Sequence, residues 1–459
     1  MKKYVLFSCV GDTDPYRDGY DGSMIHIVRY YRPKKVYLYY SKEKRKEEDI
    51  NNRCKRAIHY LDNNIEIQEY PKEEKNLLKD VHKYDDFYAP FIKIINTIKL
   101  ENPESIILLN MSSGTPAMKT TMALINILFN GTDTKLIQVA TPKKSTNANV
   151  RHDNVSKDEN VEYIMENLID NLVYEGENLN RCTEENLEQT RKIITYENII
   201  KMLSKYDFCG IYNILEERKK LFNSQVVEYA QHLYYRYIGE TEKAIEIARS
   251  LNKENEYYPI KDEKTKWIIE KYNILDIKLK RKEYQDYLIG LGTLIEEIEK
   301  KMLEIKGIEI SKFTYIAKDN SSKELKKDND VDAELLNKYY PNIYEKLRNE
   351  KIGKLNWTIL GIMLKCCWNE NDKLNKIPEK IENINKIRND RNLAAHTIRV
   401  KKYNKEDYIK AHEDLKYLIT KIKVGKNENF NEAMNIYNKI GNEIINLMRN
   451  ELTDVYCDK

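Results

Sequence analysis

A short stretch near the C-terminal end of the chain combines residue types that can cleave a phosphodiester. It reads Arg-Asn-Leu-Ala-Ala-His at 391–396, within a segment, 378–400, whose apolar residues recur at helical spacing. A helix there has one apolar stripe, and beside it an arc without a carboxylate that holds Arg388, Arg391, Asn392, His396 and Arg399. An ordinary surface helix carries charges of both signs, so we interpret this face as one that binds a phosphodiester.

Each of these residue types has a role in the cleavage of RNA without a metal. Histidine moves protons near neutral pH, so His396 is predicted to handle the protons when a ribose 2′-hydroxyl attacks the neighbouring phosphate. A guanidinium stabilises the spread negative charge of the transition state, which is the role predicted for Arg391. Asn392 lies one turn before His396 and is predicted to position the reacting groups. Arg388 and Arg399 are predicted to support the RNA phosphate.

The positions of Arg391 and His396 also favour a dimer. They lie at opposite ends of the arc, so one helix does not readily focus both on one phosphate. Two copies packed across a twofold axis would bring four such groups together. The alternative is that this face is simply solvated, because an arginine five residues before a histidine arises by chance in many chains.

Length and composition set the broad class. The 459 residues suggest two to four domains, and 33% charged against 41% hydrophobic residues indicates a soluble globular protein. The net charge of +4 restricts any nucleic-acid site to a local patch. We find neither a signal peptide nor a hydrophobic run of membrane-spanning length, which predicts a cytoplasmic protein that does not contact a membrane. Seven scattered cysteines without CxxC spacing argue against a structural zinc site, and no metal site is predicted.

The first 150 residues alternate between predicted strands and helices. Strands are predicted at 4–10, 35–40, 65–70, 105–110 and 135–140, and helices at 24–29, 41–61, 87–100 and 116–129. This order predicts a mostly parallel, Rossmann-like sheet, whose ligands bind beyond the carboxyl ends of the strands. Two loops lie at such ends, an Asp-rich loop at 11–22 and a loop at 110–119 in which Thr115 is a suitable N-cap and Pro116 a suitable first helical residue. The second loop is either an anion site or merely a well-capped turn.

The rest of the chain is predicted to be helical. A polar break at 175–185 marks a boundary, and helix follows helix from 186 to about 281. A long amphipathic helix at 283–305 begins a further bundle. We predict that His232 is a core or surface residue and that His412, in a charged helix without an arginine arc, is solvated.

Four motifs together resemble a known family. Gly-Asp-Thr-Asp-Pro at 11–15, His-Ile-Val-Arg-Tyr-Tyr-Arg-Pro-Lys-Lys at 26–35 and Asn-Met-Ser-Ser-Gly-Thr-Pro-Ala-Met-Lys at 110–119 resemble a CARF domain. The Arg-Asn-x-x-Ala-His stretch resembles the HEPN ribonuclease signature. In one chain, they resemble the CARF–HEPN ancillary ribonucleases of type III-A CRISPR systems.

The resemblance implies an α/β plus all-α protein: a Rossmann-like CARF sensor domain at 1–180, a helical spacer at 181–281 and an all-helical HEPN domain at 282–459. It implies a homodimer that binds a cyclic oligoadenylate, hexa-adenylate rather than tetra-adenylate, and needs no other cofactor. The activator-binding residues would be Gly11, Asp12, Thr13, Asp14, Asn110, Ser112, Ser113, Gly114, Thr115, Pro116, Met118 and Lys119.

The implied activity is metal-independent cleavage of single-stranded RNA, not DNA, that leaves 2′,3′-cyclic phosphate and 5′-hydroxyl ends. Some members of the family also degrade their activator in the CARF pocket, where Ser112, Ser113 or Thr115 would be involved. Two alternatives remain: a nucleotide-sensing protein that binds without catalysis, and a HEPN toxin ribonuclease that no activator controls.

Overall fold

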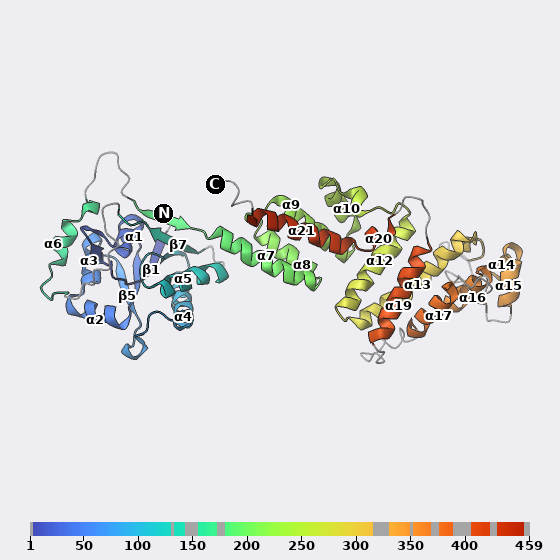
Figure 1. Ribbon diagram of the computed structural model, residues 1–459, viewed down its shortest axis with the longest axis horizontal. Coiled ribbons are helices and arrows are strands. Elements are labelled where there is room, and N and C mark those ends of the chain that lie inside the picture. The colour runs from blue at the N-terminus through green and yellow to red at the C-terminus, as the bar shows by residue number, and fades with distance from the viewer. Residues whose placement is uncertain are drawn as a thin grey trace, which may run out of the picture. The chain divides into compact units, whose positions relative to one another are not determined.

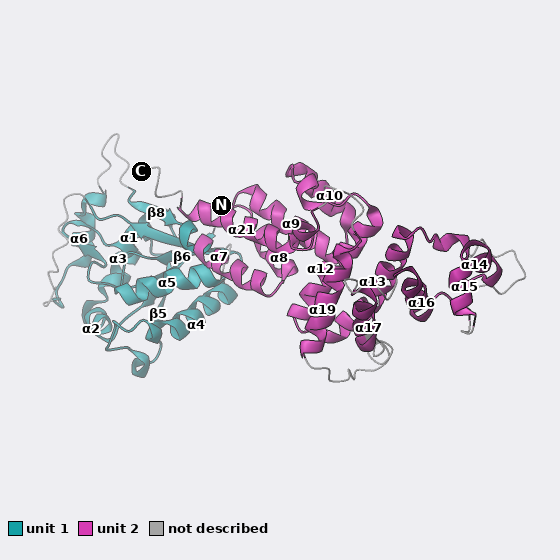
Figure 2. Ribbon diagram, turned by 45° about the vertical axis from the view of Figure 1, so that its right-hand side comes forward, with its two compact units in different colours: residues 1–191 teal, residues 192–459 magenta. Residues whose placement is uncertain are grey.

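The chain forms two compact units, residues 1–191 and 192–459 (Figure 2). The computed structural model describes residues 3–129, 133–142, 155–171, 180–314, 330–348, 352–368, 376–388, 405–422 and 429–453. Each unit has hydrophobic cores of its own.

Unit 1 is built on a six-stranded sheet in the order β5-β4-β1-β6-β7-β8 (Figure 1). Its strands are β1 (Lys3–Cys9), β4 (Lys35–Tyr39), β5 (Glu66–Tyr70), β6 (Ser105–Asn110), β7 (Thr134–Val139) and β8 (Cys182–Glu185). All neighbours pair in parallel except β7 and β8, which are antiparallel. A small hairpin of β2 (Tyr16–Arg17) and β3 (Tyr20–Asp21) lies in the loop after β1. The predicted mostly parallel, Rossmann-like sheet is therefore confirmed.

Helices cover both faces of this sheet. They are α1 (Ser23–Tyr31), α2 (Lys42–Asn51), α3 (Arg53–Leu61), α4 (Asp85–Glu101), α5 (Pro116–Phe129) and α6 (Val161–Glu166), with short 3-10 turns η1 (Glu74–Asn76) and η2 (Ile169–Asn171). Leu6 of β1 packs in a core with residues of α1 and α3, whereas Val5 and Phe7 pack in the opposite core with residues of α4 and α5. Because both faces are buried, the central strands are continuously apolar in sequence.

Two predictions for unit 1 were wrong in detail. The single helix predicted at 41–61 is interrupted at Asn52, whose φ of 53° ends α2. The buried Glu48 carboxylate then accepts hydrogen bonds from the backbone N–H groups of Cys54 and Lys55, which starts α3 in a new direction. The end of the segment predicted as a polar break is the edge strand β8; it is polar because only one of its edges is paired.

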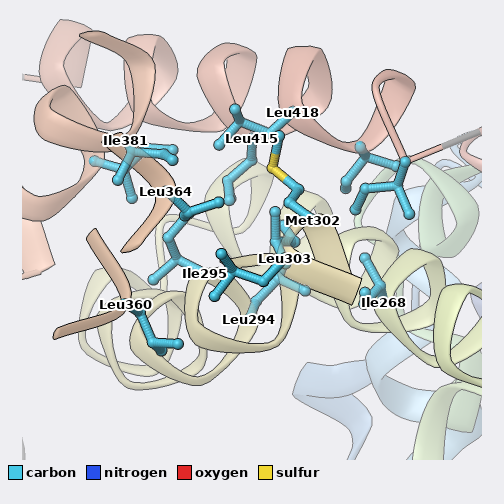
Figure 3. Close-up of a cluster of buried hydrophobic side chains, with 14 of the residues drawn as sticks. Ile268, Leu294, Ile295, Met302, Leu303, Leu360, Leu364, Ile381, Leu415 and Leu418 are labelled. Atoms are coloured by element: carbon cyan, nitrogen blue, oxygen red, sulfur yellow. The ribbon is translucent and has the colours of Figure 1, made fainter. Parts of the chain in front are cut away.

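Unit 2 is helical and has two cores. One core joins α7 (Glu188–Ser204), α8 (Phe208–Glu217), α9 (Ser224–Ile238), α10 (Thr241–Ser250), α11 (Glu254–Tyr257), α12 (Glu263–Lys280) and α21 (Ile436–Thr453). The other joins α12 with α13 (Tyr284–Ile305), η3 (Ile310–Lys312), α14 (Ala333–Tyr339), α15 (Pro341–Leu347), α16 (Trp357–Cys367), α17 (Ile377–Arg388), α19 (Lys405–Thr420) and α20 (Phe430–Ala433). Figure 3 shows Leu294 and Ile295 of α13 together with Ile381 of α17 and Leu415 of α19 in this second core.

The division into domains at 180 and 281 stays a prediction. Within unit 2, α21 packs on α9 although nearly two hundred residues separate them in sequence. The last helix that the structure describes thus shares a core with the predicted spacer. Among the helices that the structure describes, none is both long and apolar enough to cross a membrane.

The prediction that His412 is solvated was wrong. His412 is 7% exposed, and its ring stacks on Tyr272 of α12 with 4.4 Å between the ring centroids. The charged neighbours Glu413 and Lys416 lie on the exposed face of α19, which is why the local sequence is charged around a buried ring. His232 is a core residue, fully buried beneath Tyr257 and Tyr258.

Candidate functional site

Unit 1 contains a cavity of about 390 Å³ beyond the carboxyl ends of β1, β6 and β7. This is the edge at which parallel α/β sheets bind their ligands. Its lining comprises Gly11, Asp12, Thr13, Arg17, Tyr20, Asp21, Gly22, Ser23, Ser112, Gly114, Lys119, Val139, Ala140, Thr141, Pro142 and Arg181. Six residues predicted from the sequence are therefore in this lining: Gly11, Asp12, Thr13, Ser112, Gly114 and Lys119.

Glycines let the two predicted loops approach each other at the base of the cavity. A Cβ on Gly11 would lie 2.8 Å from the backbone nitrogen of Gly114. Gly114 has a φ of +90°, and a Cβ there would lie 2.9 Å from Cβ of Cys9. The loops therefore meet through their backbones, and a larger residue at either position would separate them.

Three other predicted residues form a buried polar network beneath the cavity. The Asp14 carboxylate accepts hydrogen bonds from the backbone N–H groups of Gly11 and Met24, each at 3.1 Å, and from the Ser113 hydroxyl. The Asn110 amide donates to the hydroxyls of Ser8 and Ser23 and accepts from the backbone of Ser112. Burial raises the pKa of Asp14, although these hydrogen bonds oppose the shift. The network ties the loop after β1 to the loop after β6.

The remaining predicted residues form the start of α5. The Thr115 hydroxyl donates to the carbonyl of Val81 at 2.7 Å and accepts from the Met118 N–H at 3.4 Å. Pro116 is an exposed first residue of the helix, and Met118 is buried in the core. None of the three is in the lining of the cavity. The structure thus places them in the capped turn that was the alternative interpretation of this loop.

The cavity has a positive charge that its own carboxylates do not neutralise. Lys119 is half-buried in the lining and has no carboxylate within 4 Å among the described residues. Asp12, by contrast, pairs with Lys44 at 2.9 Å on α2. A half-buried ammonium beside polar loops is suited to an anionic ligand.

Arg181 also lines the cavity, although no motif around it in the sequence predicts a site there. It precedes β8, and its guanidinium donates to the carbonyls of Ala140 and Asp21 and to the Asp170 carboxylate. Its backbone N–H donates to Nε2 of His26 at 3.0 Å. Only the antiparallel return of β8 along β7 brings this arginine to the cavity.

Asp21, which is in the lining of the cavity, forms a buried cluster with His26 and Asp170 beside Arg181, and the ligand atoms of the three lie within 4.8 Å of one another. Carboxylates and an imidazole at this spacing are the residue types that can bind a metal ion. Arg29 binds both oxygens of Asp21, at 2.6 and 2.7 Å, and Arg181 binds Asp170 at 3.1 Å. Burial alone would raise the pKa of Asp21, but the hydrogen bonds from Arg29 and His26 outweigh it and lower that pKa. The carboxylates thus serve as partners of guanidinium groups that brace the wall of the cavity.

The second predicted site continues from α17 in unit 2. Arg391, Asn392, His396 and Arg399 lie outside the described residues, and Arg388 is the last residue of α17. Ile384 and Ile387, which the helical wheel placed on the apolar stripe, are 0% and 5% exposed. The part of the predicted helix that the structure describes therefore has the expected buried face.

Comparisons with known proteins identify both halves of the chain. The family model of the Cas_Csm6 CARF domain matches residues 67–182, and that of the Cas_Csm6 HEPN domain matches residues 257–445. The latter range includes the Arg391–His396 stretch.

Curated relatives agree with these models. The chain is 28% identical over 305 residues to the CRISPR system endoribonuclease Csm6′ of Streptococcus thermophilus, an alignment that covers 65% of this chain and 72% of the relative. It is 27% identical to Csm6 of the same organism, over 64% of each chain. A shorter alignment with Csm6 of Mycobacterium tuberculosis is 37% identical over 31% of this chain and 33% of the relative. The first two alignments thus span about two thirds of each relative's length.

Enterococcus italicus Csm6, solved bound to cyclic hexa-2′-fluoro-hexa-dAMP, shares the fold. The superposition has a TM-score of 0.69 at 19% sequence identity and covers 97% of this chain and 100% of the other. A CARF model and a HEPN model of one family match in sequence order and together span more than half of the residues, and the fold agrees along almost the whole chain. This protein therefore belongs to the Csm6 family of CARF–HEPN proteins.

Proposed function

We propose that this protein is an endoribonuclease of CRISPR antiviral defence that cleaves single-stranded RNA when a cyclic oligoadenylate binds in the cavity of unit 1. The observation that supports this proposal is the combination, in one chain of this family, of an anion-suited cavity at the strand ends with the HEPN signature at 391–396. Curated relatives are named endoribonucleases, and a structural neighbour binds a cyclic hexa-adenylate analogue.

On the sensor side, Lys119 and Arg181 contact phosphates of the activator, and the loops at 11–13 and 112–114 contact its riboses and bases. A cyclic oligoadenylate with an even number of nucleotides has twofold symmetry, so we propose that a homodimer holds it, with half of the ring in each subunit. Hexa-adenylate is proposed over tetra-adenylate. Binding shifts the equilibrium of the dimer toward the state in which the two nuclease sites are aligned.

On the nuclease side, the 2′-oxygen of the substrate ribose attacks the adjacent phosphorus and the 5′-oxygen leaves. His396 moves the protons, from the 2′-hydroxyl and to the leaving oxygen, Arg391 stabilises the charge on the phosphoryl oxygens, and Asn392 positions the reacting groups. Arg388 and Arg399 support the RNA phosphate. The products are a 2′,3′-cyclic phosphate and a 5′-hydroxyl, and the reaction requires no metal.

The direct test is cleavage of 5′-labelled single-stranded RNA in EDTA, without activator, with cyclic tetra-adenylate and with cyclic hexa-adenylate. We expect cleavage in EDTA only when activator is present, most strongly with the hexa-adenylate. Periodate and kinase treatment of the fragments should show blocked 3′ ends and free 5′-hydroxyls. Absence of cleavage in every reaction would favour a nucleotide-sensing binding protein, and equal cleavage in every reaction would favour an uncontrolled HEPN ribonuclease.

We also propose that the cavity slowly degrades its activator. All three hydroxyls have hydrogen-bond partners: Ser112 bonds the backbone of Val139, Ser113 donates to Asp14, and Thr115 donates to Val81. Of the three residues, Ser112 alone is in the lining of the cavity. Ser112 is therefore the residue to substitute. Loss of labelled cyclic hexa-adenylate over hours with the wild type, and slower loss with Ser112→Ala, is the expected result.

A further inference from the structure

A buried carboxylate on α19 holds α17 at two points. Asp414 is 2% exposed. One of its oxygens accepts a hydrogen bond from Nζ of Lys380 at 2.6 Å, and the other accepts from Nδ2 of Asn383 at 3.2 Å. Lys380 and Asn383 are one turn apart on the same face of α17. A single side chain therefore binds two successive positions along that helix.

These hydrogen bonds restrict the orientation of α17 more tightly than its apolar packing does. Ile381, Ile384 and Ile387 bury the helix in the same core as Leu415 and Leu418 of α19, and Figure 3 shows Ile381 and the two leucines. Aliphatic contacts have little directionality, and such cores tolerate small changes of packing. A charged carboxylate with two directed donors fixes both the rotation of the helix and its position along its axis.

The helix held in this way leads directly into the HEPN signature. α17 ends at Arg388, and Arg391 follows three residues later in the sequence. We propose that Asp414 is a positioning residue of the nuclease. Through Lys380 and Asn383 it sets the orientation of α17, the helix that comes just before Arg391, Asn392 and His396 in the sequence. Its meaning for catalysis rests on the proposed ribonuclease function, whereas the clamp on α17 rests on the contacts of described side chains alone.

The same helix offers a matched control on its exposed face. Lys386 forms an ion pair with Glu382 at 3.7 Å, and both side chains are about two-thirds exposed. This pair also joins two positions of α17, but it connects the helix to itself and not to α19. Loss of an exposed pair of this kind changes helix stability little.

The experiment compares Asp414→Ala, Asp414→Asn, Lys380→Ala and, as the control, Glu382→Ala in the full-length protein. Two quantities are measured well below the melting temperature: kcat and KM for activator-stimulated RNA cleavage, and hydrogen exchange of the backbone amides of α17. Misplacement of catalytic groups by a fraction of an ångström to 1 Å lowers rates by about 10- to 100-fold. We therefore expect Asp414→Ala to lower kcat by about that factor with KM nearly unchanged, and to speed exchange in α17.

The other variants test the assignment to one carboxylate. Asp414→Asn should recover part of kcat, because its amide oxygen still accepts from Lys380 and the Asn383 amide can turn to present its own oxygen. Lys380→Ala removes one of the two donors, at a side chain that is partly exposed, and should give an intermediate loss of kcat. This variant keeps the test valid if Asp414→Ala does not fold. Glu382→Ala should leave both measurements unchanged.

Each contrary result has a distinct meaning. Wild-type exchange rates in α17 of Asp414→Ala and Lys380→Ala would overturn the clamp. Faster exchange with a wild-type kcat would overturn the positioning role. If the wild-type protein cleaves no RNA with any activator, the proposed function fails, while the exchange rates still decide whether Asp414 fixes α17.

Discussion

The two units fix the elements next to their candidate sites by different physical means. In unit 1 the loops at the strand ends are held by buried polar side chains, chiefly Asp14 and Asn110, beneath a cavity lined by other residues of the same loops. In unit 2 an apolar core buries α17, and the Asp414 carboxylate supplies its directed contacts to α19. A loop has no apolar face to bury, so it is ordered by hydrogen bonds, whereas a helix already has satisfied backbone groups and needs only its orientation fixed.

The largest expected effect is a loss of RNA cleavage in a variant of unit 2 that still binds activator in unit 1. His396→Ala should lower the rate of activator-stimulated RNA cleavage by about 100- to 10,000-fold, because proton transfer loses its positioned group. Binding of cyclic hexa-adenylate, measured by titration calorimetry, should not change. His59→Ala, which removes an exposed histidine of α3, is the matched control and should cleave RNA normally. Loss of activator binding in His396→Ala would contradict the assignment of activator binding to unit 1 and of cleavage to unit 2.

The next effect tests the polar support of the loops in unit 1. Asp14→Ala leaves the N–H groups of Gly11 and Met24 and the Ser113 hydroxyl without their acceptor. We expect the free energy of unfolding of unit 1 to fall by about 3 kcal/mol. Asp12→Ala, at a carboxylate that is 71% exposed, should change it by less than about 0.5 kcal/mol. Chemical denaturation followed by a probe in each unit measures this, and equal effects of the two substitutions would contradict the scaffold role of Asp14.

A pH-dependent effect is expected in unit 2. Burial, with the nearby charge of Arg236, lowers the pKa of His232 to about 3, against 6.5 for a free histidine. Below pH 6.5 the unfolded chain binds a proton that the folded chain excludes, so stability is lost as the pH falls. Between pH 7.5 and 5 the loss due to this residue is about 2 kcal/mol. His232→Phe should show a correspondingly shallower decline in denaturation midpoints across this range. A decline identical to that of the wild type would show that His232 is not its cause.

The smallest expected effect is at Thr115. It tests whether this residue only stabilises the loop before α5 or also contacts a ligand in the cavity. Thr115→Ala removes the cap of α5 and should cost unit 1 about 1 kcal/mol. The affinity for cyclic hexa-adenylate should change by less than about threefold, because the hydroxyl faces Val81 and not the cavity. Thr115→Ser should restore stability. A tenfold loss of affinity without loss of stability would instead show that this hydroxyl contacts the activator.

The sequence predicts elements well where burial makes a periodic pattern. The central strands and the helices α1, α4 and α5 lie within a few residues of the predicted ranges, because continuous apolar runs and helical spacing are direct consequences of burial on two faces or one. β8 was missed because a short, polar edge strand has no such pattern. The break between α2 and α3 was missed because it depends on Glu48 capping a later turn, a contact made by folding.

The candidate cavity shows a different limit of prediction from sequence. Polar residues at strand ends mark the edge of the sheet at which the cavity lies. The sequence does not distinguish Lys119, which lines the cavity, from Asp14 and Asn110, which hold the loops together. Both roles select the same residue types. Arg181 reaches the cavity from a segment distant in sequence, through the pairing of β8 with β7. Such residues become visible only once the topology is known.

We propose that the cavity of unit 1 controls cleavage in unit 2. The most direct test of this control is the rate of RNA cleavage as a function of cyclic hexa-adenylate concentration for the wild type and Lys119→Met. Loss of one charged hydrogen bond to a phosphate is expected to raise the half-maximal concentration by about 10- to 100-fold. The maximal rate at saturating activator should stay that of the wild type, because the nuclease residues are untouched. A superimposable curve, or a lower maximal rate at an unchanged half-maximal concentration, would show that activator does not control cleavage through Lys119 in this cavity.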